Sequence, residues 1–419
     1  MSPQPASPPK PGHPFAPFRY PAFRAIWIAN LTSNLGSMVQ SVAAAWLMTE
    51  LTTSHQLIAL VQASVTIPVM LLGVFAGAIA DNYDRRLVML WAQAGMLVVS
   101  ALLAVLTYAG SIGPFLLLAF TLLMGCGSAL NGPAWQASVR LQVGPTDLPQ
   151  AISLNTIAFN LARSVGPALG GLLISLTSPA LAFALNALSF VALIVVLLRW
   201  RPEAPALTRR PILASVVQGL RYCAESSPLR RILVRGLAFG FCAAGYQAMM
   251  PVLVRERLHG SEIVFGLVLG AFGIGSIVTA LWVAPLRRRF GSEAVTIAAS
   301  LVYAVALAAV AFAPGLGWAI AAALLAGGGW VSVLTTLNVA MQLRSPEAIL
   351  GRCLAIYQAT TFGGMALGSY TMGLASDAIG LVPALTLFAV LMAASALILP
   401  IFFPMPGRGE GHVSATGAT

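Results

Sequence analysis

The decapeptide at positions 77–86, GAIADNYDRR, carries four charged residues within six positions and interrupts an otherwise uncharged part of the chain. The residues before it, from position 51 to 80, contain no Asp, Glu, Lys or Arg, and neither do residues 87–139 after it. An α-helix needs about 20 apolar residues to cross the hydrocarbon of a bilayer. We therefore interpret the decapeptide as a short loop between membrane-spanning helices.

Composition extends this interpretation to the whole chain. Of the 419 residues, 58% are hydrophobic and only 8% are charged, whereas about a quarter are charged in an ordinary soluble domain. A soluble protein with one very large core is excluded, because too few polar residues remain to cover such a core. The sequence predicts an integral membrane protein.

Breaks that contain Gly and Pro divide the apolar runs into predicted spans, six on each side of the segment 199–235. The predicted fold is an all-α membrane protein, with twelve transmembrane helices in two pseudo-symmetric six-helix bundles. The spans are expected within residues 25–49, 57–80, 87–139 (two spans), 148–198 (two spans), 236–254, 263–286, 294–343 (two spans), 353–376 and 381–404.

The domain boundaries follow from these spans. Residues 22–200 are the predicted amino-terminal bundle, and residues 230–404 are the carboxy-terminal bundle. The basic linker 201–229 is expected to contain a short amphipathic helix on the membrane surface. Its apolar residues are Ile212, Val216, Val217, Leu220 and Tyr222. The proline-rich residues 1–21 and residues 405–419 are expected to be disordered tails.

Basic residues predict the orientation, because cytoplasmic loops retain Lys and Arg. With both termini in the cytoplasm, only Arg255 and Arg257 fall in an outer loop and only Arg163 falls inside a span. The net charge of +11 is therefore a signal of topology. Nucleic acid is not an expected partner, since the arginines are spread over separate inner loops.

The opening decapeptide resembles the loop signature of the major facilitator superfamily, in which a Gly, an Asp and a basic pair recur at fixed spacing. The matching residues are Gly77, Asp81, Arg85 and Arg86, and Asp84 stands where the family has a second glycine. The corresponding loop of the second half, ALWVAPLRRRFG, keeps a basic cluster but has no acid. The superfamily resemblance covers nearly the whole chain and implies transport by alternating access.

Two further stretches resemble branches of this superfamily. ARSVGPALGG, at positions 162–171, is similar to the glycine–proline motif of its drug antiporters, with Ala162 in place of the leading glycine. The stretch FAPFRYPAFRAIWIANLTSNLGSMVQ, at positions 15–40, resembles the branch that contains the enterobactin exporter and related secretion permeases. The substrate does not follow from either resemblance.

The resemblance implies that the charged loop is a conformational gate, a latch between the bundles that favours the outward-open state. Asp81 is expected to face the positive amino-terminal end of the eleventh span. The glycine would let a neighbouring helix approach closely. The alternative is that these charges only anchor a tight inner turn. The residues of the predicted gate are Gly77, Asp81, Arg85, Arg86, Arg140 and Arg352.

Polar side chains within the spans are candidates for the substrate path. On the first span they fall within about 100° of the helix circumference, with Gln40 at the edge. Such a stripe either bonds a neighbouring helix or lines a wet cavity. The first span contributes Asn30, Ser33, Asn34, Ser37, Gln40 and Ser41. Later spans contribute Tyr246, Gln247, Asn338, Gln342, Tyr357 and Gln358.

Arg163 is the strongest single candidate for the path. It lies about 15 residues into the fifth span, or roughly 22 Å at 1.5 Å per residue, too deep to reach the surface easily. An arginine at this depth is costly in lipid, so it should face a cavity or a partner. Thr156, Asn160, Arg163 and Pro167 share one helix face. Backbone carbonyls, Asn side chains, water or an anionic substrate group are the candidate partners, and a scaffolding role remains the alternative.

Small residues in the fifth and eighth spans predict a close contact between the two bundles. In the fifth span the packing motif comprises Gly166, Pro167, Gly170 and Gly171, where the proline also permits a kink. The eighth span offers a complementary face with Gly266, Gly270, Gly273 and Gly275. Close contact there would let the bundles rock without a leak, although ordinary tight packing has the same signature.

No Asp or Glu lies in the middle of a predicted span, and there is no phosphate-binding Gly-rich loop. No nucleophile–base–acid set or metal-binding spacing occurs, so we expect no enzyme, metal or cofactor. The sequence predicts a secondary-active transporter of the bacterial inner membrane, a monomer that exports amphipathic small molecules such as drugs or siderophores. Exchange for protons is what the superfamily resemblance implies, and the residues themselves leave the coupling ion open. The alternatives are an uptake permease for a polar solute, or a transporter-like receptor or lipid-handling protein.

Overall fold

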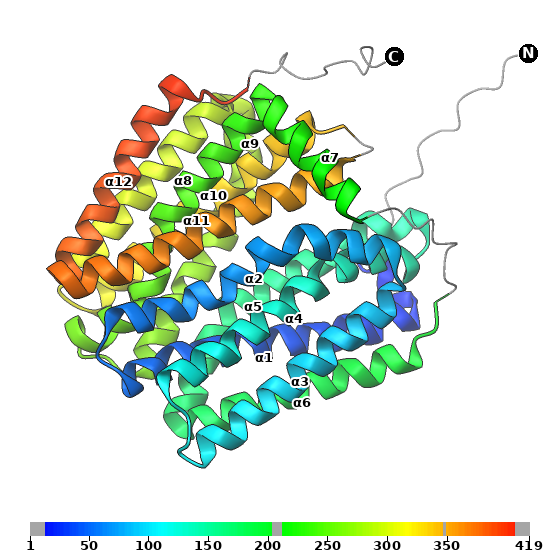
Figure 1. Ribbon diagram of the computed structural model, residues 1–419, viewed down its shortest axis with the longest axis horizontal. Coiled ribbons are helices and arrows are strands. Elements are labelled where there is room, and N and C mark those ends of the chain that lie inside the picture. The colour runs from blue at the N-terminus through cyan, green and yellow to red at the C-terminus, as the bar shows by residue number, and fades with distance from the viewer. Residues whose placement is uncertain (1–12, 203–211, 347–348, 407–419) are drawn as a thin grey trace, which may run out of the picture.

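The computed structural model describes residues 13–202, 212–346 and 349–406, which contain helices and no strand (Figure 1). The amino-terminal bundle contains α1 (Pro21–Leu51), α2 (His55–Asn82), α3 (Arg85–Tyr108), α4 (Pro114–Ser138), α5 (Leu148–Leu176) and α6 (Pro179–Arg199). The carboxy-terminal bundle contains α8 (Ser227–Val252), α9 (Glu262–Ala311), α10 (Leu316–Arg344), α11 (Leu350–Ile379) and α12 (Leu381–Phe402). The remaining elements are the linker helix α7 (Ile212–Glu225) and the short turns η1 (Ala16–Arg19), η2 (Val139–Leu141), η3 (Pro145–Asp147) and η4 (Leu253–Arg257).

The predicted twelve spans are present, although α9 contains two of them. Gly291, with φ 84° and ψ 162°, breaks α9 after the basic cluster and reverses the chain. A residue with a Cβ would be strained at this φ. Within the described ranges, nine helices are long and apolar enough to cross a membrane. Helices α1 and α11, of 31 and 30 residues, are also long enough to span a membrane, but polar side chains lower the hydropathy of each.

Local sequence explains where the helices begin and end. Gly110 adopts φ 67° at the turn after α3, and Pro114 occupies the first turn of α4. A proline is tolerated there because its missing N–H has no helical partner at that position. Ser178 caps α6 by accepting a hydrogen bond from Leu181 N at 3.4 Å. These short connections hold consecutive helices antiparallel.

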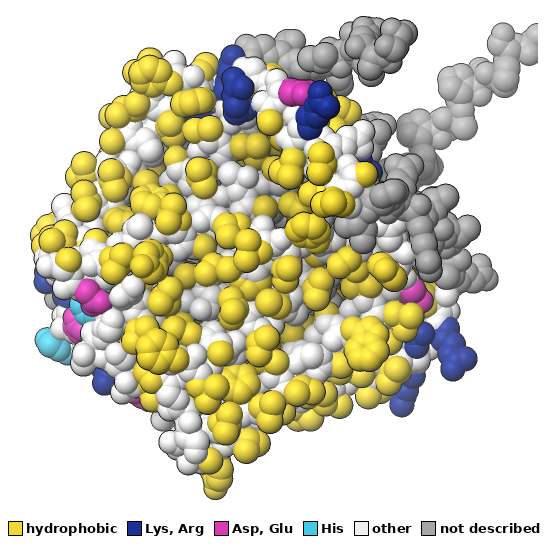
Figure 2. Space-filling view, viewed as in Figure 1, with side chains coloured by type: hydrophobic (Ala, Val, Ile, Leu, Met, Phe, Trp, Pro, Cys, Tyr) yellow, Lys and Arg dark blue, Asp and Glu magenta, His cyan; other side chains and the backbone are white. Residues whose placement is uncertain are grey.

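The molecular surface is that of a multi-pass membrane protein. Figure 2 shows hydrophobic side chains across the visible face, with charged side chains gathered toward its ends. Large side chains such as Trp91, Leu281 and Ile401 are 80%, 74% and 73% exposed. Such exposure would be unfavourable in water and is expected against lipid.

The two bundles meet closely at one end only. We call the end that carries α7, the start of α1 and the end of α12 the linker end, and the other end the far end. At the far end α2 and α11 converge, as Figure 1 shows for the blue and orange helices. A Cβ added to Gly373 would lie 2.6 Å from Gln56 Cα, and one added to Gly363 would lie 2.8 Å from Met70 Sδ. Beyond Met70, toward the linker end, the two helices separate.

Part of the expected amino-terminal tail is structured. Phe18 packs edge-on against Trp27 with ring centroids 5.1 Å apart, and Arg19 forms an ion pair of 2.5 Å with Asp147. Tyr20 donates a hydrogen bond to the same carboxylate at 3.0 Å. The prediction of a disordered tail is therefore wrong for residues 13–21, because aromatic packing and this buried acid attach them to the bundle. Residues 1–12 lie outside the described residues.

The start of the expected carboxy-terminal tail is also attached. Met405 N donates to Glu293 at 2.5 Å, and the carbonyl of Pro406 accepts a hydrogen bond from Arg344. Positions 405 and 406 therefore pack against the bundle, contrary to the prediction, while residues 407–419 lie outside the described residues. Helix α7 lies within the predicted linker, and its Gly219 packs against Arg352 of α11; its place on a membrane surface stays a prediction. Linker residues 203–211 are not described.

Candidate transport pathway and gates

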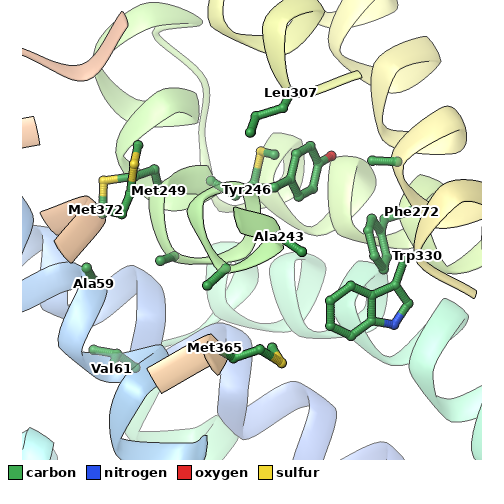
Figure 3. Packing of buried hydrophobic residues seen from close by; sticks show 14 of the residues in the cluster. Ala59, Val61, Ala243, Tyr246, Met249, Phe272, Leu307, Trp330, Met365 and Met372 are labelled. Carbon is green, nitrogen blue, oxygen red and sulfur yellow. The ribbon is translucent and has the colours of Figure 1, made fainter. Parts of the chain in front are cut away.

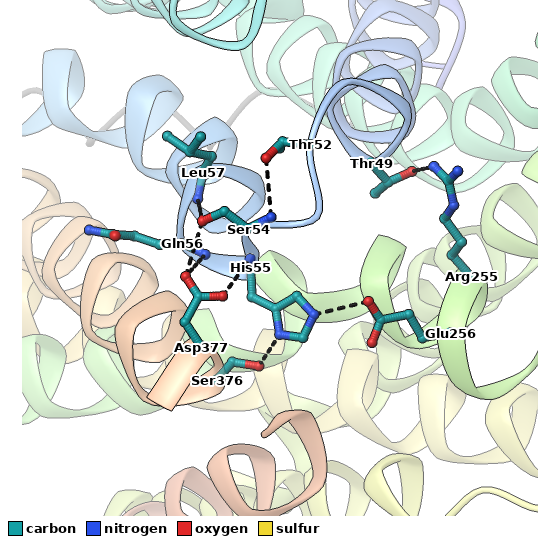
Figure 4. A network of polar contacts seen from close by, with 10 residues as sticks. All are labelled: Thr49, Thr52, Ser54, His55, Gln56, Leu57, Arg255, Glu256, Ser376 and Asp377. Carbon is teal, nitrogen blue, oxygen red and sulfur yellow. Dashed lines mark hydrogen bonds and ion pairs between the residues drawn. The ribbon is translucent and has the colours of Figure 1, made fainter. Parts of the chain in front are cut away.

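A polar network joins the bundles at the far end (Figure 4). The carboxylate of Asp377, at the end of α11, accepts hydrogen bonds from the backbone of α2. The donors are His55 N at 2.8 Å and Gln56 N at 3.1 Å, with Ser54 Oγ adding a third at 3.0 Å. The first N–H groups of a helix have no helical acceptor and carry partial positive charge. Asp377 therefore caps a helix of the other bundle.

The side chain of His55 extends this network to a third segment. Its Nε2 lies 3.0 Å from Glu256 Oε1 of η4, and its Nδ1 lies 2.7 Å from Ser376 Oγ of α11. Nε2 must carry a hydrogen to donate to a carboxylate, so in the neutral ring Nδ1 accepts from the serine hydroxyl. Arg255 adds a further bond between the bundles, from its guanidinium to Thr49 Oγ1 at 2.9 Å. We call these residues the far-end gate.

The linker end lacks the close approach expected at Gly77. A Cβ added there would meet no atom within 4 Å, although Gly77 lies only about 10 Å along α2 from Met70. No helix therefore approaches Gly77 closely in this conformation, and the predicted contact stays a prediction for the state in which the linker end is closed.

The basic pair of the predicted gate bonds within its own bundle. Arg85 donates to Ala137 O at 3.1 Å, and Arg86 donates to Leu197 O at 2.7 Å. Asp84 caps α3 by accepting from Arg86 N at 2.9 Å. In this state these residues anchor the turn between α2 and α3 onto α4 and α6.

The other members of the predicted gate are placed less completely. Arg140 is exposed in η2. Arg352 donates to Gln218 of α7 at 2.6 Å, so the linker helix contacts the start of α11. The backbone of Asp81 lies in the last turn of α2, and its side chain is outside the described residues.

Arg163 projects from α5 toward aromatic rings of the other bundle. Its guanidinium carbon lies over the ring of Phe272 in α9 at 5.9 Å from the centroid, and over Trp330 in α10 at 5.7 Å. The side chain is partly exposed although it lies deep in the bundle. A cation over an aromatic face is attracted by the negative face of the ring. Arg163 therefore contacts both bundles in the interior of the protein.

These rings belong to a larger aromatic cluster, part of which is drawn in Figure 3. Tyr246 of α8 stacks on Phe272 with centroids 5.6 Å apart and meets Tyr303 at 6.1 Å. Tyr303 donates to Ala243 O at 2.9 Å. The hydroxyl of Tyr246 is buried and has no hydrogen-bond partner among the described residues. The cluster that contacts Arg163 thus contains a polar group without a partner among the described residues.

The polar stripe of α1 divides into two environments. Gln40 is 5% exposed, and its Oε1 accepts from Ser100 Oγ at 2.5 Å and from Asn186 Nδ2 at 2.8 Å. These bonds join α1, α3 and α6 inside one bundle. Gln40 therefore bonds neighbouring helices, one of the two alternatives for this stripe, and does not line a cavity in this conformation. Asn30 and Ser33 are also buried, while Asn34 and Ser37 are half-buried and Ser41 is exposed.

The remaining candidates for the path lie on α5, α8, α10 and α11. Asn160 and Gln247 are half-buried, and the side-chain nitrogen of Gln247 has no partner among the described residues. Gln342 donates to Asn338 one turn earlier at 2.6 Å. Tyr357 is 4% exposed and donates to Leu334 O at 3.3 Å. Gln358 is exposed.

The predicted contact between the fifth and eighth spans is present, but only some of the predicted glycines make it: Gly171, Gly266, Gly270 and Gly273. A Cβ on Gly171 would lie 2.3 Å from Glu262 O, and one on Gly266 would lie 2.6 Å from Pro167 O. Gly166 and Gly170 instead face α1 within their own bundle, against Met38 and Val39. A Cβ on Gly273 would lie 2.5 Å from Ser164 Cα, whereas Gly275 faces Leu324 of α10.

Sequence reasoning missed the far-end gate and the aromatic partners of Arg163. A signal for the first was present, since Glu256, Asp377 and His55 all stand at predicted helix ends. Their pairing could not be foreseen, because their separations along the chain are 201 and 322 residues. Phe272 and Trp330 carried no signal, since isolated aromatic residues are common in apolar spans.

Comparisons with known proteins identify the family. The family model described as transmembrane secretion effector matches residues 12–415. The chain is 26% identical over 377 residues to the staphyloferrin A transporter of Staphylococcus aureus, covering 88% of this chain and 92% of that protein. It is also 26% identical over 391 residues to the multidrug efflux pump Tap of Mycolicibacterium fortuitum, covering 90% and 95%. A third relative is the enterobactin exporter EntS of Shigella boydii, at 26% identity, 84% and 85% coverage.

Solved structures show the same fold at low identity. The nucleoside transporter NupG aligns with a TM-score of 0.70 and 15% identity, covering 91% of this chain and 99% of that one. The D-xylose–proton symporter aligns with a TM-score of 0.70 and 15% identity, covering 93% and 98%. The sequence match and the paired bundles agree: the chain belongs to the transmembrane secretion effector family, within the major facilitator superfamily of secondary transporters.

Proposed function

We propose that the protein exports amphipathic small molecules across the bacterial inner membrane by alternating access. In this proposal the linker end faces the cytoplasm, and the conformation described is open toward it. The positive-inside distribution of the arginines supports this orientation. Export is also the activity named for two of its relatives, the multidrug efflux pump Tap and the enterobactin exporter EntS.

One contrast carries the proposal of alternating access. Asp377 caps α2 across the bundle boundary at the far end, whereas Gly77 on the same helix meets nothing at the linker end. Two paired bundles can exchange which end is closed by rocking about the contact in the middle. The close glycine contacts between α5 and α9 support this role for that pair of helices.

The interior supports an amphipathic cargo. The aromatic cluster supplies an apolar wall, while Arg163 and the hydroxyl of Tyr246 supply polar contacts. Ligand sites are usually built in this way, from mostly apolar walls with a few placed polar groups. Exchange for protons is the driving reaction that the superfamily resemblance implies, and we propose that a single chain completes the cycle.

Transport into everted membrane vesicles tests this function. Vesicles that contain the protein are given an acidic interior and a panel of radiolabelled amphiphiles, with vesicles from cells lacking the protein as the control. We expect accumulation of at least one compound that a protonophore abolishes. Accumulation only in right-side-out vesicles would instead identify an uptake permease, and no protein-dependent movement in either would contradict the proposal of a transporter of amphiphiles.

A further inference from the structure

The geometry of Arg163 leaves its hydrogen-bonding edge unused. A guanidinium is planar and carries five N–H donors. Its carbon lies 5.9 and 5.7 Å from the ring centroids of Phe272 and Trp330, which attract the positive charge but offer no carbonyl or carboxylate acceptor. Among the described residues no acceptor binds these N–H groups, and the side chain remains partly exposed.

The charge of Arg163 is also uncompensated within the spans. Every Asp and Glu within residues 13–202, 212–346 and 349–406 stands at a helix end or turn, or beside the break at Gly291. Arginine deep in a membrane protein normally pairs with an acid or lines a polar cavity. In the same aromatic cluster, the buried Tyr246 hydroxyl is a second donor without a partner among the described residues.

We propose that Arg163 binds the anionic group of the transported substrate, and that the substrate is an organic anion. The anionic group is planar with two oxygens, as in a carboxylate, because this shape matches two parallel N–H groups of the guanidinium. The body of the substrate is apolar or aromatic and lies against Trp330 and Phe272. This inference rests on the proposed transport function and names the charge class of its cargo.

The position of Arg163 links such binding to the cycle. Arg163 belongs to α5 of one bundle, and both rings belong to α9 and α10 of the other. An anion on the guanidinium edge whose body rests on the rings would contact both bundles at once. Rocking of the bundles changes this arrangement, so affinity for the anion should differ between the two end states.

A set of probes that differ only in charge tests the inference. The purified full-length protein in nanodiscs is titrated with 2-naphthoate, the neutral 2-naphthamide and the cationic 2-naphthylmethylammonium. We expect 2-naphthoate to bind about 10- to 100-fold more tightly than the other two, the range for a charge-assisted hydrogen-bonded pair. Equal or tighter binding of the amide or the ammonium probe by the natural protein would overturn the inference.

Matched variants assign any preference to Arg163. Arg163→Gln should bind all three probes alike, and Arg163→Lys should keep only part of the preference because the planar fork is lost. Arg221→Gln is the control, since Arg221 is an exposed arginine of α7 that pairs with Glu225. If Arg163→Gln keeps the preference for 2-naphthoate, the inference is wrong. If that variant does not fold, the Lys variant decides: full retention of the preference contradicts a bidentate contact.

The outcomes separate this inference from the proposed function. Vesicles that transport only neutral or cationic amphiphiles would support an exporter and contradict the organic anion. Arg163-dependent binding of 2-naphthoate without gradient-driven movement of any compound would support the anion site and contradict export.

Discussion

The backbone N–H of His55 donates a hydrogen bond of 2.8 Å to the carboxylate of Asp377 and so connects the two bundles, although the two residues are 322 positions apart in the chain. The carboxylate lies at the positive end of α2, so its charge stabilises the closed far end. The first N–H groups of α2 have no acceptor within their own helix, and they bind an acid of the other bundle in the far-end gate.

Replacing Asp377 with Asn should weaken the far-end gate. A charge at a helix terminus contributes roughly 0.3 to 2 kcal/mol, so the equilibrium should shift toward far-end opening by about 2- to 30-fold. Labelling of a single cysteine introduced at position 56 would report the opening. Glu225→Gln, an exposed acid of α7, is the control, and an unchanged labelling rate in the Asp377 variant would mean that the network does not limit opening.

Gly171→Ala should damage the contact between α5 and α9. The new Cβ would lie 2.3 Å from the backbone oxygen of Glu262, which cannot move away as a flexible side chain could. Overpacking of this kind costs about 1–3 kcal/mol. We expect a lower unfolding temperature and slower transport.

Gly95→Ala is the matched control for that change, because a Cβ there meets nothing within 4 Å. Alanine is favoured over glycine inside a helix by about 0.5–1 kcal/mol. Gly95→Ala should therefore be neutral or stabilising, and equal damage in both variants would show that the interface is not the cause.

Gly77→Leu should be tolerated in the conformation described here and should block the conformation in which the linker end is closed. In the state described here the larger side chain has room, so insertion and thermal stability should stay close to those of the natural protein. Closure of the linker end would bring α11 toward this position, and the leucine should block it. We expect transport to fall strongly while a cysteine in the linker-end vestibule stays reactive. Normal transport would show that closure does not bring a helix to Gly77.

Gln40→Ala should lower the stability of the protein more than it affects the transport step. The amide oxygen of Gln40 accepts bonds from the buried side chains of Ser100 and Asn186. In the variant, Ser100 keeps Phe183 O as an acceptor at 3.0 Å, whereas the Asn186 amide loses this acceptor. Leaving buried donors unpaired costs about 1–3 kcal/mol. We expect a clearly lower unfolding temperature, whereas Gln358→Ala, at an exposed position of α11, should leave stability unchanged. A Gln40→Ala variant with unchanged stability and impaired transport would instead assign Gln40 to the substrate path.

Features that reside in one segment could be predicted from the sequence. Uncharged runs longer than about 20 residues predict membrane spans, because the bilayer thickness sets the required length. The breaks between spans, the linker helix and the depth of Arg163 likewise follow from residue positions within a single segment. The superfamily signature around Gly77 and Asp81 also indicates a gate, although its closed form is absent from the described state.

Features that join distant segments were decided by the tertiary structure. Gly166, Gly170 and Gly171 lie within six positions of one another in the sequence. In the structure α5 packs against two different helices, so the first two glycines face α1 and the third faces α9. The spacing of small residues reports that a helix can be approached closely, and not which helix approaches it.

The sequence alone thus determined the membrane fold, its twelve spans and the one deep arginine, because length, hydropathy and charge act locally. The tertiary structure alone decided that Asp377 caps α2, that Gln40 bonds two helices of its own bundle, and that Phe272 and Trp330 meet Arg163. A hydrogen bond or a ring contact needs its partner within a few ångströms. Only the packing of the two bundles brings these partners together.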